Sequence, residues 1–93
     1  MFGLSEKTYK EIIDITKMYE CKFILFGSRA RGDYKENSDI DIAVEGNINE
    51  KMEYSIRNKF DLLNIPYTID IIFLSKETKE ELQEAIKKEG VEL

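Results

Sequence analysis

The stretch FGSRARG at residues 26–32, followed by SDIDIAV at residues 38–44, decides the fold of this chain. A glycine-serine turn ends an apolar run in the first stretch, and Asp39 and Asp41 alternate with apolar residues in the second. Aspartate is uncommon in strands because it packs poorly and competes for backbone hydrogen bonds. Residues i and i+2 of a strand share a face. Two carboxylates on one strand face, beside a turn of small residues, indicate a site for a divalent cation and phosphate.

The rest of the chain alternates helix and strand patterns around these two runs. Apolar side chains recur at helical spacing in three segments, residues 5–20, 49–63 and 75–89. Short runs of apolar residues predict three strands, residues 22–26, 40–44 and 67–74, with a tail or short edge strand at 91–93.

The connections between these segments predict how the strands pair. The segment between the first two strands is too short for a helical crossover, so these strands are expected to be antiparallel neighbours. The second and third strands are joined through a helix, which allows a parallel pair. We therefore predict an α+β fold with a small mixed sheet of three to four strands and helices packed on one face. The other face, carrying Asp39, Asp41 and Asp70, is expected to be open.

Size and composition limit the possible functions. The 93 residues predict a single domain over residues 1–93 with a modest core. The net charge of −5 argues against nucleic acid or an anionic membrane as a direct partner. The chain has no histidine, which excludes Ser-His-Asp and Cys-His nucleophile systems and the usual zinc sites. It shows no signal-peptide pattern and no apolar run of membrane-spanning length, so we expect a cytoplasmic protein.

Asp39, Asp41 and Asp70 are the acidic residues inside the apolar runs predicted as the second and third strands. If these strands are adjacent, the three carboxylates share one patch, where they repel one another and raise each other's pKa. A bound Mg²⁺ removes this repulsion, because it prefers oxygen ligands and is often held by carboxylates together with substrate phosphates. Two such ions would activate an attacking oxygen and stabilise a leaving phosphate.

The turn between the two stretches offers groups that bind phosphate. Gly27 and Ser28 can present backbone N–H groups and a hydroxyl to triphosphate oxygens, with no Cβ at Gly27 in the way. Arg29 and Arg31 could add positive charge to the same phosphates, although each is by itself more typical of a surface residue. Taken singly, the aspartates are also typical of solvent-facing strand positions. The combination at fixed spacing favours a nucleotide and metal site.

The pattern of Gly27-Ser28, ten residues, Asp39-Ile40-Asp41 and then Asp70 resembles the signature of the DNA polymerase beta-like nucleotidyltransferase superfamily. The fuller runs at 26–33 and 38–44, and the closing residues 86–93, are similar to its minimal members, the MNT proteins. The resemblance implies that the aspartates bind two Mg²⁺ ions and act as the catalytic residues. It also implies that the glycine-serine pair holds the nucleotide triphosphate.

The resemblance further implies a biological context. Minimal nucleotidyltransferases are commonly antitoxins paired with a HEPN-domain toxin in a prokaryotic toxin–antitoxin system. They can move AMP from ATP to a tyrosine hydroxyl of that toxin, which predicts a protein adenylyltransferase in a hetero-oligomer. Two alternatives stay open: an antitoxin that acts mainly by binding and masking its toxin, and a small-molecule transferase of the aminoglycoside-modifying kind. The chain has no P-loop pattern, which disfavours an ATPase or kinase of that type.

Overall fold

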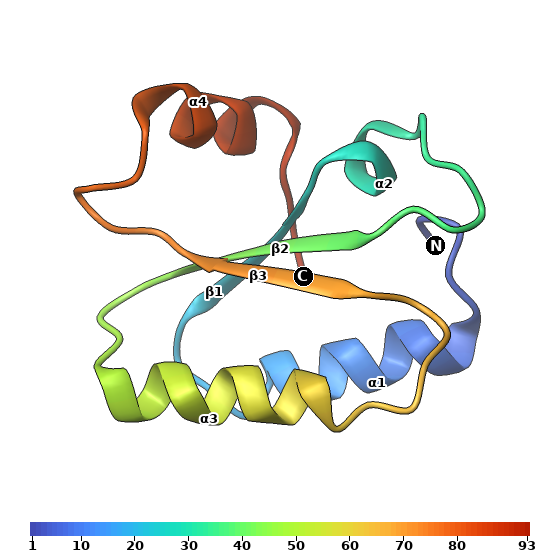
Figure 1. Cartoon of the computed structure of the whole chain (residues 1–93), viewed down its shortest axis with the longest axis horizontal. Coiled ribbons are helices and arrows are strands. Elements are labelled where there is room, and N and C mark those ends of the chain that lie inside the picture. Colours follow the sequence, from blue (N-terminus) through green and yellow to red (C-terminus); the bar gives the residue numbers. More distant parts are fainter.

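The structure is a computed structural model that describes residues 1–93. Its centre is a sheet with the strand order β3-β2-β1-β4 (Figure 1). The strands are β1 (Lys22–Phe26), β2 (Ile40–Glu45), β3 (Ile69–Phe73) and β4 (Val91–Glu92). β1 pairs antiparallel with both β2 and β4, and β2 pairs parallel with β3. The predicted mixed sheet is confirmed, including the short edge strand at the end of the sequence.

Two helices cover one face of this sheet, as predicted. They are α1 (Glu6–Thr16) and α3 (Glu50–Asp61), which lie side by side beneath the strands in Figure 1. Each begins at a side-chain cap: the Ser5 hydroxyl accepts the Thr8 N–H at 3.2 Å, and the Asn49 amide oxygen accepts the Met52 N–H at 2.8 Å. Such caps satisfy backbone donors that the first helical turn leaves unpaired.

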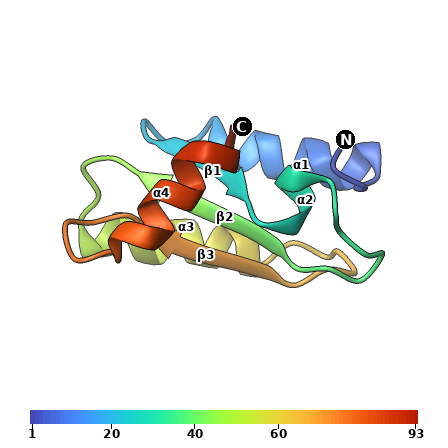
Figure 2. The same ribbon diagram turned by 90° about the horizontal axis from the view of Figure 1, so that it is seen from above.

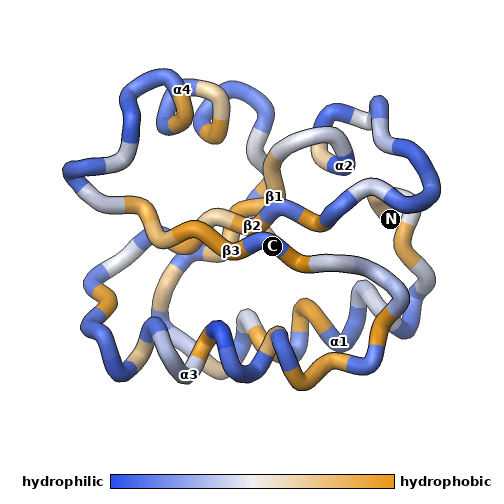
Figure 3. Tube along the Cα trace, viewed as in Figure 1, coloured by the Kyte–Doolittle hydropathy of each residue, from blue (hydrophilic) through white to orange (hydrophobic).

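The core lies between these helices and the sheet. Phe23 and Leu25 of β1 and Ile40, Ile42 and Val44 of β2 are buried and form one cluster with apolar residues of both helices. The strands are largely apolar in Figure 3, while hydrophilic and hydrophobic residues alternate along α1 and α3. The period-two pattern of β2 therefore sends alternate residues into the core and leaves Asp41 on the opposite face.

The helix α4 (Glu80–Glu89) corrects the expectation that all helices lie on one face. It lies on the face opposite α1 and α3, across the sheet in Figures 1 and 2. The reason is that this face is apolar at one end: Ala43 is fully buried, Ile24 lies against Gly90, and Ile86 of α4 is 3% exposed. α4 covers that part of the sheet, and the part that carries the aspartates stays open.

The boundaries of α4 also differ from the prediction. The sequence favours a helix that Ser75 caps, whereas α4 begins five residues later and lacks a side-chain cap. Ser75 instead shapes a turn, in which its hydroxyl accepts the Glu77 N–H and its own N–H donates to the Thr78 hydroxyl. None of the helices is long and apolar enough to span a membrane.

Candidate active site

The strand register brings the predicted aspartates to one face of the sheet. Asp41 of β2 lies opposite Asp70 of β3 in the parallel pair, and residues in register on adjacent strands point to the same side. Asp39 precedes β2 by one residue and shares the face of Asp41 by the same periodicity. Asp39 and Asp70 are exposed, whereas Asp41 is half-buried.

The charges of these carboxylates act on one another. Partial burial raises the pKa of Asp41 above its ordinary value, and the negative charges of Asp70 and Asp39 raise this pKa further. The positive charge of Arg31 opposes the shift. The ionised patch is therefore unfavourable on its own, and a cation bound beside Asp41 would relieve both the desolvation and the repulsion.

The donor chemistry of this patch fits Mg²⁺, which takes carboxylate oxygens and retains water ligands. As the side chains stand, no group of three acidic or cysteine side chains is close enough together to hold one ion. The carboxylates would therefore have to turn toward a common point on binding. Exposed positions such as Asp39 and Asp70 leave room for that adjustment.

Gly27 places the predicted phosphate-binding turn directly beside Asp41. The preceding residue, Phe26, is paired in register with Asp41, so the chain turns away from β1 at this carboxylate. Gly27 has φ 77° and ψ −158°, a conformation that is essentially restricted to glycine. A Cβ at this position would collide with the Asp41 carboxylate. Glycine therefore allows both the sharp turn and the close approach of turn and carboxylate.

Ser28 follows this turn as the first residue of the short helix α2 (Ser28–Arg31). The helix is closed by backbone hydrogen bonds from the Arg31 N–H to the Gly27 carbonyl and from the Gly32 N–H to the Ser28 carbonyl, at 3.0 and 2.9 Å. The turn and α2 thus hold the predicted phosphate-binding residues together beside the aspartates.

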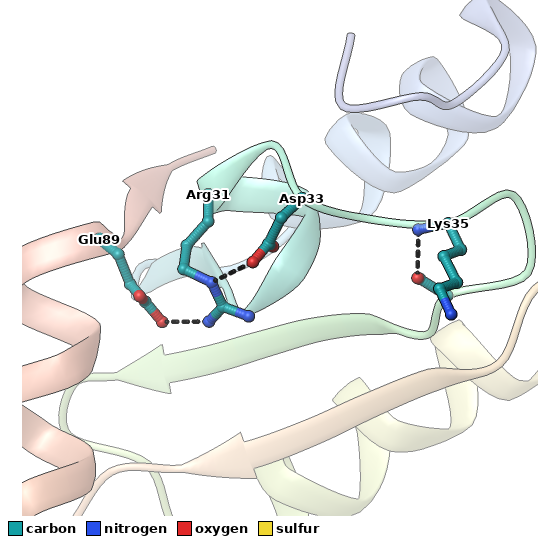
Figure 4. A network of polar contacts seen from close by, with 5 residues as sticks. Arg31, Asp33, Lys35 and Glu89 are labelled. Atoms are coloured by element: carbon teal, nitrogen blue, oxygen red, sulfur yellow. Dashed lines mark hydrogen bonds and ion pairs between the residues drawn. The ribbon is translucent and has the colours of Figure 1, made fainter.

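Arg31 extends from α2 as an exposed side chain with two acidic partners (Figure 4). Its guanidinium contacts Asp33 at 3.3 Å and Glu89 of α4 at 3.1 Å. The positive charge of Arg31 also lowers the pKa of Asp41. Exposed ion pairs of this kind contribute little and exchange readily. The contact with Glu89 was missed by the sequence analysis, because Glu89 reads as one more charge on a solvated helix.

Arg29 corrects the prediction that it binds the nucleotide. Its side chain is 1% exposed, and the guanidinium donates to the backbone carbonyls of Phe2, Glu36 and Ser38. It also lies against the rings of Tyr34 and Tyr67. With these partners the side chain faces the interior and has no free path to a triphosphate. The motif itself does not reveal this, because the partners of Arg29 include Phe2 and Tyr67, which are distant in sequence.

Comparison with known proteins identifies the family of the chain. Residues 10–93 match the family model described as polymerase beta, nucleotidyltransferase. A protein of Methanocaldococcus jannaschii named "Putative protein adenylyltransferase" is 41% identical over 76 residues, which cover 77% of this chain and 75% of that protein.

Three solved structures share the fold. A toxin-antitoxin with AMP-PNP superposes with a TM-score of 0.67 at 23% identity, over 89% of this chain and 69% of that chain. A mutant toxin-antitoxin named MntA-HpeT gives a TM-score of 0.63 at 22% identity, over 96% and 72%. A "putative nucleotidyltransferase" of Sulfolobus solfataricus gives 0.53 at 25% identity, over 91% and 74%.

Proposed function

Because the chain belongs to the polymerase beta nucleotidyltransferase family, we propose that it transfers AMP from ATP to a tyrosine hydroxyl of a partner toxin of the HEPN type. The observation that carries this proposal is the contact between the two halves of the site. Asp41 faces Asp70 across the parallel strands and abuts Gly27, the residue that opens the phosphate-binding turn. Nucleotide phosphates and a carboxylate-bound cation would meet at this point.

In the proposed reaction, the acceptor hydroxyl oxygen attacks the α-phosphorus of ATP in line with the leaving group. A new P–O bond forms, the bond to the β-phosphate oxygen breaks, and pyrophosphate leaves. Asp39, Asp41 and Asp70 would hold Mg²⁺, which would supply the positive charge that such a transfer requires. Asp70, exposed at the edge strand, orients the hydroxyl and accepts its proton.

The residues around the aspartates bind the triphosphate in this proposal. Gly27 and Ser28 present backbone N–H groups and the Ser28 hydroxyl to its oxygens. The absence of a Cβ at Gly27 lets this turn lie directly against the Asp41 carboxylate. Arg31 leaves its exposed acidic partners and adds charge to the same phosphates.

The nature of the acceptor is argued from the openness of the site. Asp39 and Asp70 are exposed on a face that α4 covers only at its other end. A folded protein acceptor could close this surface and supply the walls that exclude water. The structural relatives described as toxin-antitoxin complexes, one of them with AMP-PNP, support a toxin partner and ATP as the nucleotide. The named adenylyltransferase relative supports AMP as the group transferred.

The proposal is tested by incubating the chain with α-labelled ATP, Mg²⁺ and the product of the neighbouring gene, then mapping the labelled residue by mass spectrometry. We expect label on a tyrosine of the partner, release of pyrophosphate, and loss of both with Asp39→Asn/Asp41→Asn. Neutralisation of the toxin that survives this double change, at equal expression, would show instead that the chain acts by masking its partner. Label that appears on a small hydroxylated molecule but not on the protein would contradict the proposed acceptor.

A further inference from the structure

We infer that Arg29 is a positioning residue for the proposed transfer, and that it acts by fixing the peptide bond that leads into Asp39. This inference rests on the proposed function, because it takes Asp39 as a ligand of the metal. It concerns a residue that touches neither the nucleotide nor the ion.

The geometry at Ser38 carries the argument. Both Nε and Nη2 of Arg29 donate to the Ser38 carbonyl oxygen, at 3.1 and 2.9 Å. That carbonyl belongs to the peptide bond between Ser38 and Asp39. Two hydrogen bonds to its oxygen therefore restrain the orientation of the peptide plane that leads into Asp39. Two donors on one oxygen resist rotation of the peptide better than a single donor does.

The same guanidinium also anchors the flanking segments. Nη2 donates to the Glu36 carbonyl at 3.2 Å, and Nη1 donates to the Phe2 carbonyl at 2.9 Å. The rings of Tyr34 and Tyr67 lie 5.1 and 4.8 Å from the guanidinium carbon. The loop that precedes Asp39 is therefore attached to Arg29 at several points.

The burial of this charge calls for an explanation. The Arg29 side chain is 1% exposed, yet its hydrogen-bond partners are carbonyl oxygens and none is a carboxylate. A buried cation is costly unless its donors are satisfied. Here carbonyl dipoles and aromatic faces compensate the charge. Three of these partners, Tyr34, Glu36 and Ser38, lie in the loop that leads to Asp39.

Arg29 also connects the two halves of the site. It follows Ser28 directly in α2, so one side chain links the predicted phosphate-binding turn to the start of β2. Lysine cannot reproduce this link, because an ammonium group lacks the planar fork of the guanidinium.

The test compares Arg29→Lys with Ile12→Ala, a core change in α1 that loses packing without touching the loop. Both variants are studied where circular dichroism shows them folded. Mn²⁺ affinity is measured without nucleotide by electron paramagnetic resonance, and ¹⁵N relaxation reports the mobility of residues 36–39. Changes to residues that orient metal ligands typically weaken metal binding about 10- to 100-fold. We therefore expect Arg29→Lys to lose that much Mn²⁺ affinity and to have a mobile loop. We expect no loss of affinity in Ile12→Ala.

Tyr34→Leu provides a second variant should Arg29→Lys not fold. It removes one ring from the guanidinium and is expected to weaken Mn²⁺ binding roughly 2- to 5-fold, the equivalent of an exposed cation–π contact. Wild-type Mn²⁺ affinity and a rigid loop in either folded variant would overturn the inference. Wild-type affinity in Asp39→Asn would overturn the proposed function itself. If Mn²⁺ affinity falls in Asp39→Asn but not in Arg29→Lys, the role of Arg29 is overturned and the proposed function stands.

Discussion

Replacing Gly27 by alanine should reduce activity by more than the accompanying loss of stability explains. The residue holds φ 77° and ψ −158°, and L residues in this region pay about 1–3 kcal/mol. For a domain of this size, each kcal/mol lowers the melting temperature by about 4–8 °C. Gly27→Ala is therefore expected to fold with a clearly reduced melting temperature.

The effect on activity should be larger than this loss of stability. The new methyl group would collide with the Asp41 carboxylate and drive it from its present position. Because a displacement of about 1 Å in a reacting group can cost about 10²-fold in rate, we expect at least that loss in AMP transfer.

Gly32→Ala is the matched control. Gly32 also has a positive φ, 94°, but a Cβ there would meet nothing within 4 Å. Both variants strain the backbone at the ends of α2, and only one reaches the aspartates. Melting temperature by calorimetry and pyrophosphate release at saturating Mg²⁺ would be measured on both. Equal activities in the two variants would refute the conclusion that Gly27 is needed to admit the Asp41 carboxylate.

Three further predictions concern the charges around the site and the open edge of the sheet. Since the pKa of Asp41 is raised in the folded state, its ionised form destabilises the fold. This loss of folding free energy grows as the pH rises above 3.8, the ordinary pKa of the side chain. Asp41→Asn should raise the melting temperature at pH 7 in metal-free buffer but not at pH 3. Glu89→Gln should release Arg31 and tighten ATP binding by calorimetry with little change in melting temperature, because the pair is exposed, whereas Arg31→Met should weaken ATP binding. Arg57 donates to the outward Ile71 carbonyl at 3.3 Å and lies over Phe73 on edge strand β3. Arg57→Ala should therefore increase self-association in light scattering, whereas Lys59→Ala on the same helix should not.

Most of the fold could be predicted from the sequence because its signals are local. Alternation along β2 and the short loop before it identified the antiparallel pair, and Ser5 and Asn49 marked the starts of two helices. The position of α4 could not be predicted in the same way. Its apolar stripe shows that it packs against something, but the choice of face depends on Ile24 and Ala43 of other strands, which no local pattern connects to it.

The candidate site likewise has parts that local sequence patterns predict and parts that they do not. Spacing predicted that Asp39 and Asp41 share a face, and the expected pairing of the second and third strands added Asp70. The strand register confirms that Asp41 lies opposite Asp70, while the role of the aspartates in catalysis stays a prediction. The prediction for the Arg29 side chain was wrong because Arg29 and Arg31 were treated as equivalent members of one motif. The two residues are two positions apart on a helical turn, so their side chains point about 200° apart. Arg29 therefore enters the interior while Arg31 stays in solvent.

The topology explains why a chain this short can assemble such a site. β2 and β3 run parallel, so the aspartates near their starts meet at one end of the sheet. β1 runs antiparallel to β2, so the turn at its end, Gly27 and Ser28, arrives at that same end. One antiparallel step followed by one helical crossover thus brings three segments, the turn after β1 and the starts of β2 and β3, to one end of the sheet. Partial burial, and then the charges of Asp70 and Asp39, disfavour the ionised form of Asp41 and raise its pKa. The arrangement is therefore set by the backbone pairing and the anchored loop at Arg29, and a nucleotide with its cation would find the ligands already on one surface.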